Sequence, residues 1–159
     1  MSIQKLAMAG MFTALAVVTS TFSIPIGASK CFPIQHMVNV LCAVYLGPGY
    51  GVLVAFCTSL IRNLAGTGTF LAFPGSMAGA LMCGLIFHYT KNYIATYLGE
   101  IVGTGVIGGM LAFPVATLVM GREAALFTYV LPFLVSTIGG TLIAAILVTA
   151  LNRTKVFAR

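Results

Sequence analysis

The sequence predicts an all-α integral membrane protein with six transmembrane helices. Of its 159 residues, 60% are hydrophobic and only 6% are Asp, Glu, Lys or Arg, and the mean hydropathy is +1.08. A soluble domain averages about 25% charged residues, so this chain has too little charge to solvate a globular surface. Its apolar surface must face lipid. The length suits one integral membrane domain over residues 1–159.

Proline, glycine and charged residues separate six apolar segments. The first runs from about Lys5 to Phe22 and ends before Pro25 and Gly27. No signal-peptide cleavage pattern follows it, so we expect a retained helix. The second runs from about Ile34 to Leu46. At about 1.5 Å per residue it reaches only about 20 Å, which is short for a spanning helix.

Four further segments complete the predicted bundle. The third follows Gly47–Gly49 and ends near Leu64, and the fourth runs from about Phe73 to Tyr89. The fifth, about Tyr93 to Met120, contains Pro114, which predicts a kink or a break. The sixth runs from about Ala124 to Leu151.

The distribution of charge predicts the orientation in the cell membrane. Six spans place both termini on one side. If that side is cytoplasmic, it carries five cations against three, as the positive-inside rule expects. The five are Lys5, Lys91, Arg153, Lys155 and Arg159. We therefore expect cytoplasmic termini, and outer loops rich in Gly, Pro and Thr that cover a site.

Several classes of function are disfavoured. The cations are scattered and form no basic stripe for nucleic acid. Ser, Thr and Cys have no assembled base, and Glu100 and Glu123 make a poor acid–base pair, so we expect no enzyme. Four cysteines without a CxxC pattern predict no metal site. The GTGVIG stretch at 103–108 lacks a preceding strand, which favours close helix packing over a cofactor site.

Polar residues within the apolar segments are the candidate binding residues. Gln35, His36 and Asn39 share one side of the second helix and are too costly to face lipid. Arg62 could snorkel to the interface or turn inward as a donor. Its polar sequence neighbours favour the inward orientation. Glu100 could serve the substrate or pair with a cation such as Arg62.

The first helix carries a stripe of small residues, Ala7, Gly10 and Ala14. Such a stripe allows close approach of another helix. It could pack within this chain or form a groove for a partner subunit, and the composition leaves both readings open.

Three stretches carry a resemblance to a known family. They are FPIQHMVNVLCAVYLGP (32–48), RNLAGTGTFLAFPGSMAGA (62–80) and GEIVGTGVIGG (99–109). In these the chain resembles the substrate-binding S components of energy-coupling factor (ECF) transporters, and most closely the ThiW type associated with the thiazole moiety of thiamin. The resemblance implies an S-component bundle without cofactor that works with a transmembrane T component and two ABC ATPases. It also implies coupling through Ala7, Gly10 and Ala14.

The implied substrate is hydroxyethylthiazole, a thiamin precursor. The chain has no Trp to stack whole thiamin, which leaves Phe32, Phe70 or Phe73 to cover a smaller ring. We expect the substrate to contact Phe32, Gln35, His36, Asn39, Arg62, Asn63, Thr67, Phe73, Ser76 and Glu100. The alternatives are a self-sufficient channel or facilitator, an S component for another precursor such as a pyrimidine, and a lipid-modifying membrane enzyme.

Overall fold

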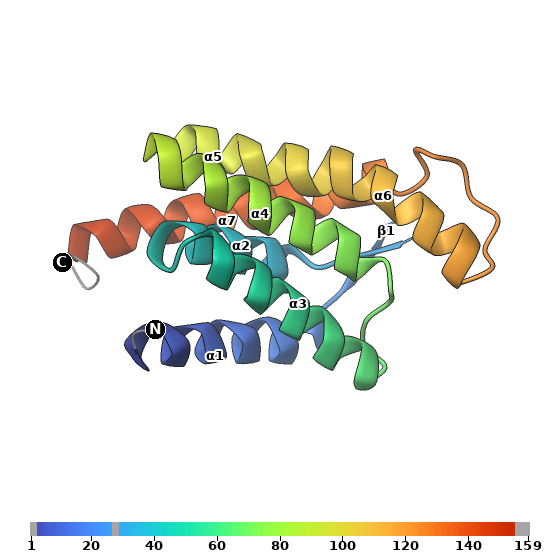
Figure 1. Ribbon diagram of the computed structural model, residues 1–159, viewed down its shortest axis with the longest axis horizontal. Helices are drawn as coiled ribbons and strands as arrows, with labels where there is room; N and C mark the ends of the chain where they lie inside the picture. Colours follow the sequence, from blue (N-terminus) through green and yellow to red (C-terminus); the bar gives the residue numbers. More distant parts are fainter. Residues whose placement is uncertain (1–2, 27–28, 155–159) are drawn as a thin grey trace.

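The structure, a computed structural model, describes residues 3–26 and 29–154 as a helical bundle with a small hairpin at one end (Figure 1). The α-helices are α1 (Ile3–Val18), α2 (Pro33–Tyr45), α3 (Pro48–Leu64), α4 (Ala72–Thr90), α5 (Tyr93–Glu100), α6 (Gly109–Pro114) and α7 (Val130–Thr154). A 3-10 turn, η1 (Thr19–Thr21), follows α1, and the π-helical segments are η2 (Ile101–Gly108) and η3 (Val115–Val119).

Six helices are confirmed among the described residues, because α5, η2, α6 and η3 form one continuous rod over Tyr93–Val119. The rod has no break at Pro114, but it changes direction at α6, in agreement with the expected kink (Figure 1). Proline removes one backbone donor. π-type pairing follows it along the chain, where Met120 N–H donates to the Val115 carbonyl five residues back at 3.1 Å.

Local signals set most helix boundaries. Pro33 and Pro48 occupy the first turns of α2 and α3, where a missing N–H costs nothing. Gly47 precedes α3 with φ of 96°, a conformation that favours glycine. Asn92 caps α5 by accepting hydrogen bonds from Ile94 N (2.9 Å) and Ala95 N (3.2 Å).

The last helix starts later than expected, at Val130 instead of Ala124. The intervening residues form a turn: Ala125 N–H donates to Thr128 Oγ1 at 2.9 Å, and Thr128 N–H donates to the Ala125 carbonyl at 3.0 Å. The threonine hydroxyl thereby competes with helix formation.

An antiparallel hairpin that the sequence did not suggest covers one end of the bundle. It pairs β1 (Ile24–Ile26) with β2 (Ser29–Cys31), with Pro25 opposite Lys30. The hairpin is fastened to α7: Cys31 Sγ donates to the Pro132 carbonyl at 3.2 Å, and Phe32 N–H donates to Ser136 Oγ at 2.8 Å.

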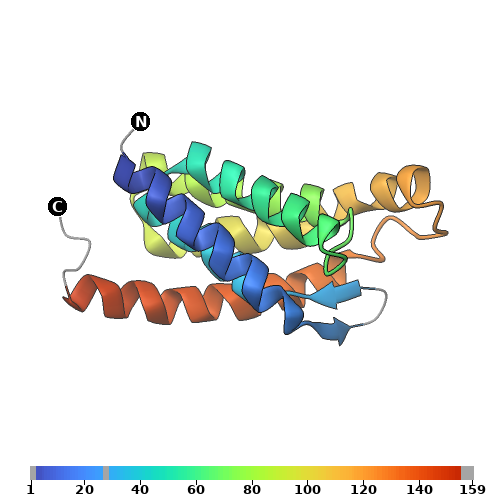
Figure 2. The same cartoon turned by 90° about the horizontal axis from the view of Figure 1, so that it is seen from below.

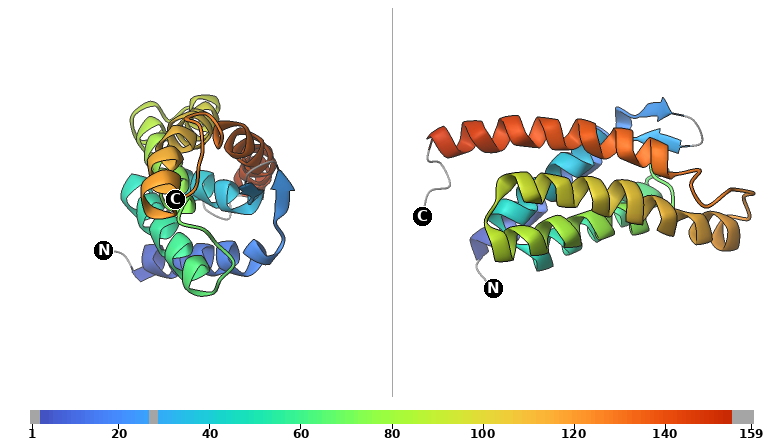
Figure 3. Two further views of the ribbon diagram at one scale, coloured as in Figure 1. Left: turned by 90° about the vertical axis from the view of Figure 1, so that its right-hand side faces the viewer. Right: turned by 90° about the horizontal axis from the view of Figure 1, so that it is seen from above.

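The helices are arranged around α2. This helix packs against α1, α3, α4, α5 and α7, and the end-on view in Figure 3 places it among them. The start of α1 and the end of α7 lie at one end of the bundle, and the hairpin and the 120–129 loop lie at the other (Figures 1 and 2).

The surface and the interior differ as expected for a protein in lipid. Large apolar side chains such as Leu53, Phe56, Leu142 and Ile146 are exposed, whereas polar groups are buried. The buried polar residues of α2 to α5 and η2 are Gln35, His36, Asn39, Thr58, Ser59, Arg62, Ser76, Thr96, Glu100 and Thr104. Among the described residues, the helical segments Ile3–Thr21, Tyr93–Val119 and Val130–Thr154 are long and apolar enough to span a membrane.

Glycines let η2 approach α4 closely. A Cβ at Gly108 would lie 2.6 Å from Gly75 Cα, and one at Gly103 would lie 2.9 Å from Gly79 Cα. We predict that Gly108→Ala lowers the melting temperature, because overpacking costs about 1–3 kcal/mol. Thermal unfolding in detergent, followed by circular dichroism, measures the change.

Gly49→Ala is the matched control. A Cβ there meets nothing within 4 Å, so its melting temperature should equal or exceed that of the wild type. Equal melting temperatures for Gly108→Ala and Gly49→Ala would contradict the close-packing argument.

Candidate functional site

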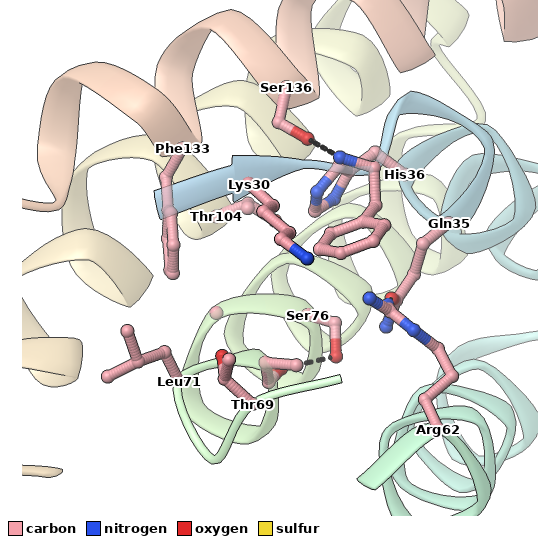
Figure 4. Close-up of a pocket in the computed structure, with 13 residues that line it drawn as sticks. Lys30, Gln35, His36, Arg62, Thr69, Leu71, Ser76, Thr104, Phe133 and Ser136 are labelled. Carbon is pink, nitrogen blue, oxygen red and sulfur yellow. Dashed lines mark hydrogen bonds between the residues drawn. The ribbon is translucent and has the colours of Figure 1, made fainter. Parts of the chain in front are cut away.

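A cavity lies beneath β2 at the hairpin end of the bundle, between α2, α3, α4, η2 and α7 (Figure 4). It holds about 380 Å³ of empty space, part of which is its open mouth. Its walls are formed by Lys30, Phe32, Gln35, His36, Arg62, Thr69, Leu71, Ala72, Gly75, Ser76, Thr104, Phe133 and Ser136.

Arg62 forms one wall of the cavity from the last turn of α3. Its side chain is fully buried and turned inward, so it does not snorkel. Nη1 donates a hydrogen bond to Gln35 Oε1, and the guanidinium carbon lies 3.7 Å from the centre of the Phe32 ring. Nε and Nη2 have no hydrogen-bond partner in the part of the chain that the structure describes. Arg62 therefore offers donors that its neighbours leave unused.

A chain of hydroxyl groups links Gln35 to α4. Gln35 Nε2 donates to Ser59 Oγ at 3.5 Å, and Ser59 Oγ and Ser76 Oγ are 3.2 Å apart. Ser76 Oγ donates to the Ala72 carbonyl at 2.8 Å. These bonds hold Gln35 with its oxygen toward Arg62.

The Glu100 carboxylate lies behind the cavity wall and is fully buried. Its Oε1 accepts hydrogen bonds from His36 Nδ1 (3.0 Å), Asn39 Nδ2 (3.0 Å) and Thr104 Oγ1 (2.9 Å). The Glu100 carboxylate is thus hydrogen-bonded to His36, and Arg62 forms no ion pair among the described residues.

This contact assigns the tautomer of His36. When Nδ1–H donates to the carboxylate, Nε2 is the acceptor atom in the neutral form of the ring. His36 belongs to the cavity wall, so Nε2 is the ring atom that remains to accept a hydrogen bond from a bound molecule.

The sequence-predicted site residues fall into three groups. Phe32, Gln35, His36, Arg62 and Ser76 line the cavity. Asn39 and Glu100 lie behind the wall and orient His36. Asn63, Thr67 and Phe73 lie outside the cavity walls.

The residues of the third group have other contacts. Asn63 Nδ2 donates to the carbonyls of Ser59 (2.8 Å) and Thr69 (3.1 Å), which holds the 65–71 segment on α3. Thr67 Oγ1 donates to the Arg62 carbonyl at 3.3 Å. The Phe73 ring packs against Phe56, with 5.7 Å between centroids.

Several wall residues were not predicted. Thr104 and Ser136 carried a usable signal, since Thr104 is one helical turn after Glu100 and Ser136 lies within an apolar run. Leu71 and Phe133 carried none, because an apolar wall residue has the same sequence signature as a lipid-facing one. No group of three or more His, Cys, Asp or Glu side chains that could hold a metal occurs in 3–26 and 29–154.

A family profile described as thiamine-precursor transporter protein (ThiW) matches residues 6–154. The chain belongs to this family. This ThiW-family chain is similar in sequence to the biotin transporter BioY of Thermotoga maritima. The two are 26% identical over 168 residues, covering 96% of this chain and 98% of that protein.

A solved structure has the same fold. The crystal structure of the S-component for biotin from an ECF-type ABC transporter superposes with a TM-score of 0.66 at 17% identity, covering 96% of this chain and 91% of that chain. The resemblance drawn from the sequence is confirmed: this ThiW-family member is a multi-pass membrane protein with the S-component fold.

The Glu100 cluster generates a prediction about stability. Glu100→Ala would remove the shared acceptor of three buried hydrogen bonds and should cost about 3 kcal/mol or more. Glu100→Gln keeps an acceptor oxygen and should cost less. Thermal unfolding ranks the variants, with Glu123→Ala on the exposed loop expected to match the wild type. Equal losses for Glu100→Ala and Glu123→Ala would contradict the role of the cluster.

Proposed function

We propose that the chain is the substrate-binding S component of an ECF-type importer and that it captures the thiamine precursor hydroxyethylthiazole. It would bind its substrate without catalysing a reaction. The family assignment supports a thiamine precursor as the transported compound. The observation that carries the proposal is a small cavity with fixed polar groups inside an otherwise apolar bundle.

The cavity suits a small heterocycle with a hydroxyl tail. Phe32, Leu71 and Phe133 provide apolar wall for a ring. His36 Nε2 offers an acceptor for a hydroxyl hydrogen, and Arg62 offers donors for its oxygen. A few fixed polar groups among apolar walls are typical of ligand sites.

The proposed orientation places both termini in the cytoplasm and the cavity toward the exterior. The start of α1, the turn between α4 and α5 and the end of α7 lie opposite the hairpin (Figure 1). They carry Lys5, Lys91 and Arg153, which supports this orientation. A substrate would then reach the cavity from outside, between the hairpin and the 65–71 segment.

The stripe on α1 supports docking of a T component, which would in turn engage two ABC ATPases. Ala7, Gly10 and Ala14 are exposed, and a Cβ at Gly10 would meet nothing within 4 Å. The buried positions of α1 are Ala9, Phe12 and Ala16, on another face. The stripe is therefore available to a partner helix.

Substitution of the polar residues tests the site. Arg62→Ala removes hydrogen-bond donors from the cavity wall. Asn39→Ala removes a hydrogen bond to Glu100, the carboxylate that orients His36. Each should weaken hydroxyethylthiazole binding by about tenfold or more, or about 1.4 kcal/mol. Titration calorimetry on purified protein measures the affinity. Arg122→Ala, on the exposed 120–129 loop, is the control and should bind like the wild type. Wild-type affinity for both site variants would remove these residues from the site.

Substitution of Gly10 tests the docking stripe. Gly10→Leu fills the groove and should abolish uptake in cells, yet leave binding in detergent unchanged because the added side chain meets no atom of this chain. Met11→Leu, at an exposed neighbouring position, should leave both unchanged. Loss of binding in Gly10→Leu would indicate internal packing.

Flux into liposomes without ATPases would favour the self-sufficient facilitator.

A further inference from the structure

The cavity wall carries two cationic side chains and no anionic one. Arg62 reaches it from α3 and Lys30 from β2 (Figure 4). The chain has only two acidic residues. Glu100 is bound to His36 behind the wall, and Glu123 is exposed on the 120–129 loop. The side chains that line the cavity therefore carry an excess of positive charge.

The positive charge of Arg62 is incompletely compensated. The side chain is fully buried, and its contacts are one hydrogen bond to an uncharged amide oxygen and the face of the Phe32 ring. Neither contact neutralises the charge. A buried ion without a counter-ion is costly, and the cost falls when an anion arrives.

The unused donors of Arg62 have the geometry of an anion site. Nε and Nη2 are both unpartnered, and together they form one edge of the guanidinium fork. This edge matches two oxygens of a carboxylate or phosphate, each accepting one hydrogen bond. Figure 4 shows the Lys30 amine directed toward the same space from the opposite side.

We infer that the cavity selects a ligand with an anionic group, a carboxylate or a phosphate, held between Arg62 and Lys30. This rests on the proposed function and refines its substrate class: the preferred compound is an acidic thiazole, and the neutral alcohol binds more weakly. The ring then lies toward Phe133 and Leu71, and the anionic group lies toward the Arg62 edge.

Titration calorimetry with three probes tests the inference. They are hydroxyethylthiazole, its phosphate ester, and methylthiazole acetic acid, in which a carboxylate replaces the CH₂OH group. At least one anionic probe should bind at least about tenfold more tightly than the alcohol. The two anionic probes distinguish a carboxylate site from a phosphate site.

Variants that remove a positive charge show which side chains cause the preference for an anionic ligand. Lys30→Gln is on the exposed hairpin, where it does not threaten folding, and should lower the ratio of anionic to neutral affinity several-fold. Arg62→Gln should lower it further, provided that circular dichroism shows a folded protein. Arg122→Gln removes a charge at the same end of the molecule but outside the cavity, and should leave the ratio unchanged.

The outcomes separate the two proposals. Equal or tighter binding of the alcohol overturns the anion preference and leaves the proposed function intact. A preference that survives in Lys30→Gln and in folded Arg62→Gln also overturns it. If none of the three thiazoles binds, the proposed function fails and the inference fails with it.

Discussion

A carboxylate within a membrane-spanning bundle needs donors from the protein, because lipid provides none. In this chain Glu100 Oε1 receives three of them, two from α2 and one from η2. These bonds fix the rotation of α2 against the rod that carries Glu100. The same rotation turns Gln35 and His36 toward the cavity, so the polar wall depends on the buried cluster beneath it. Gly79 belongs to this arrangement, since a Cβ there would lie 2.6 Å from Glu100 Oε2.

Much of the fold could be predicted from the sequence because helices that face lipid must be built from long apolar segments. Apolar runs separated at Pro25 and at Gly47–Gly49 gave helices close to the observed ones. The π-helical turns could not be predicted, since they depend on contacts with neighbouring helices. The hairpin was also missed, because its three-residue strands carry too short a pattern.

The site was predictable only in part, for a related reason. Gln35, His36 and Arg62 stood out because polar residues in apolar segments are excluded from lipid. At the end of α3 and in the loop after it that exclusion does not operate, so Asn63 and Thr67, which hold this loop on its helix, have the same sequence signature as ligand contacts. Lys30 is one of the three cations that the sequence assigns to the outer side, and its direction toward the cavity depends on the unpredicted hairpin.

The two segments that cover the cavity are tied to different helices. The hairpin is bound to α7 through Cys31 and Phe32, and the 65–71 segment is bound to α3 through Asn63. Neither can lift away without losing hydrogen bonds to its own helix. Widening the gap between the two segments therefore costs either these hydrogen bonds or a separation of α7 from α3.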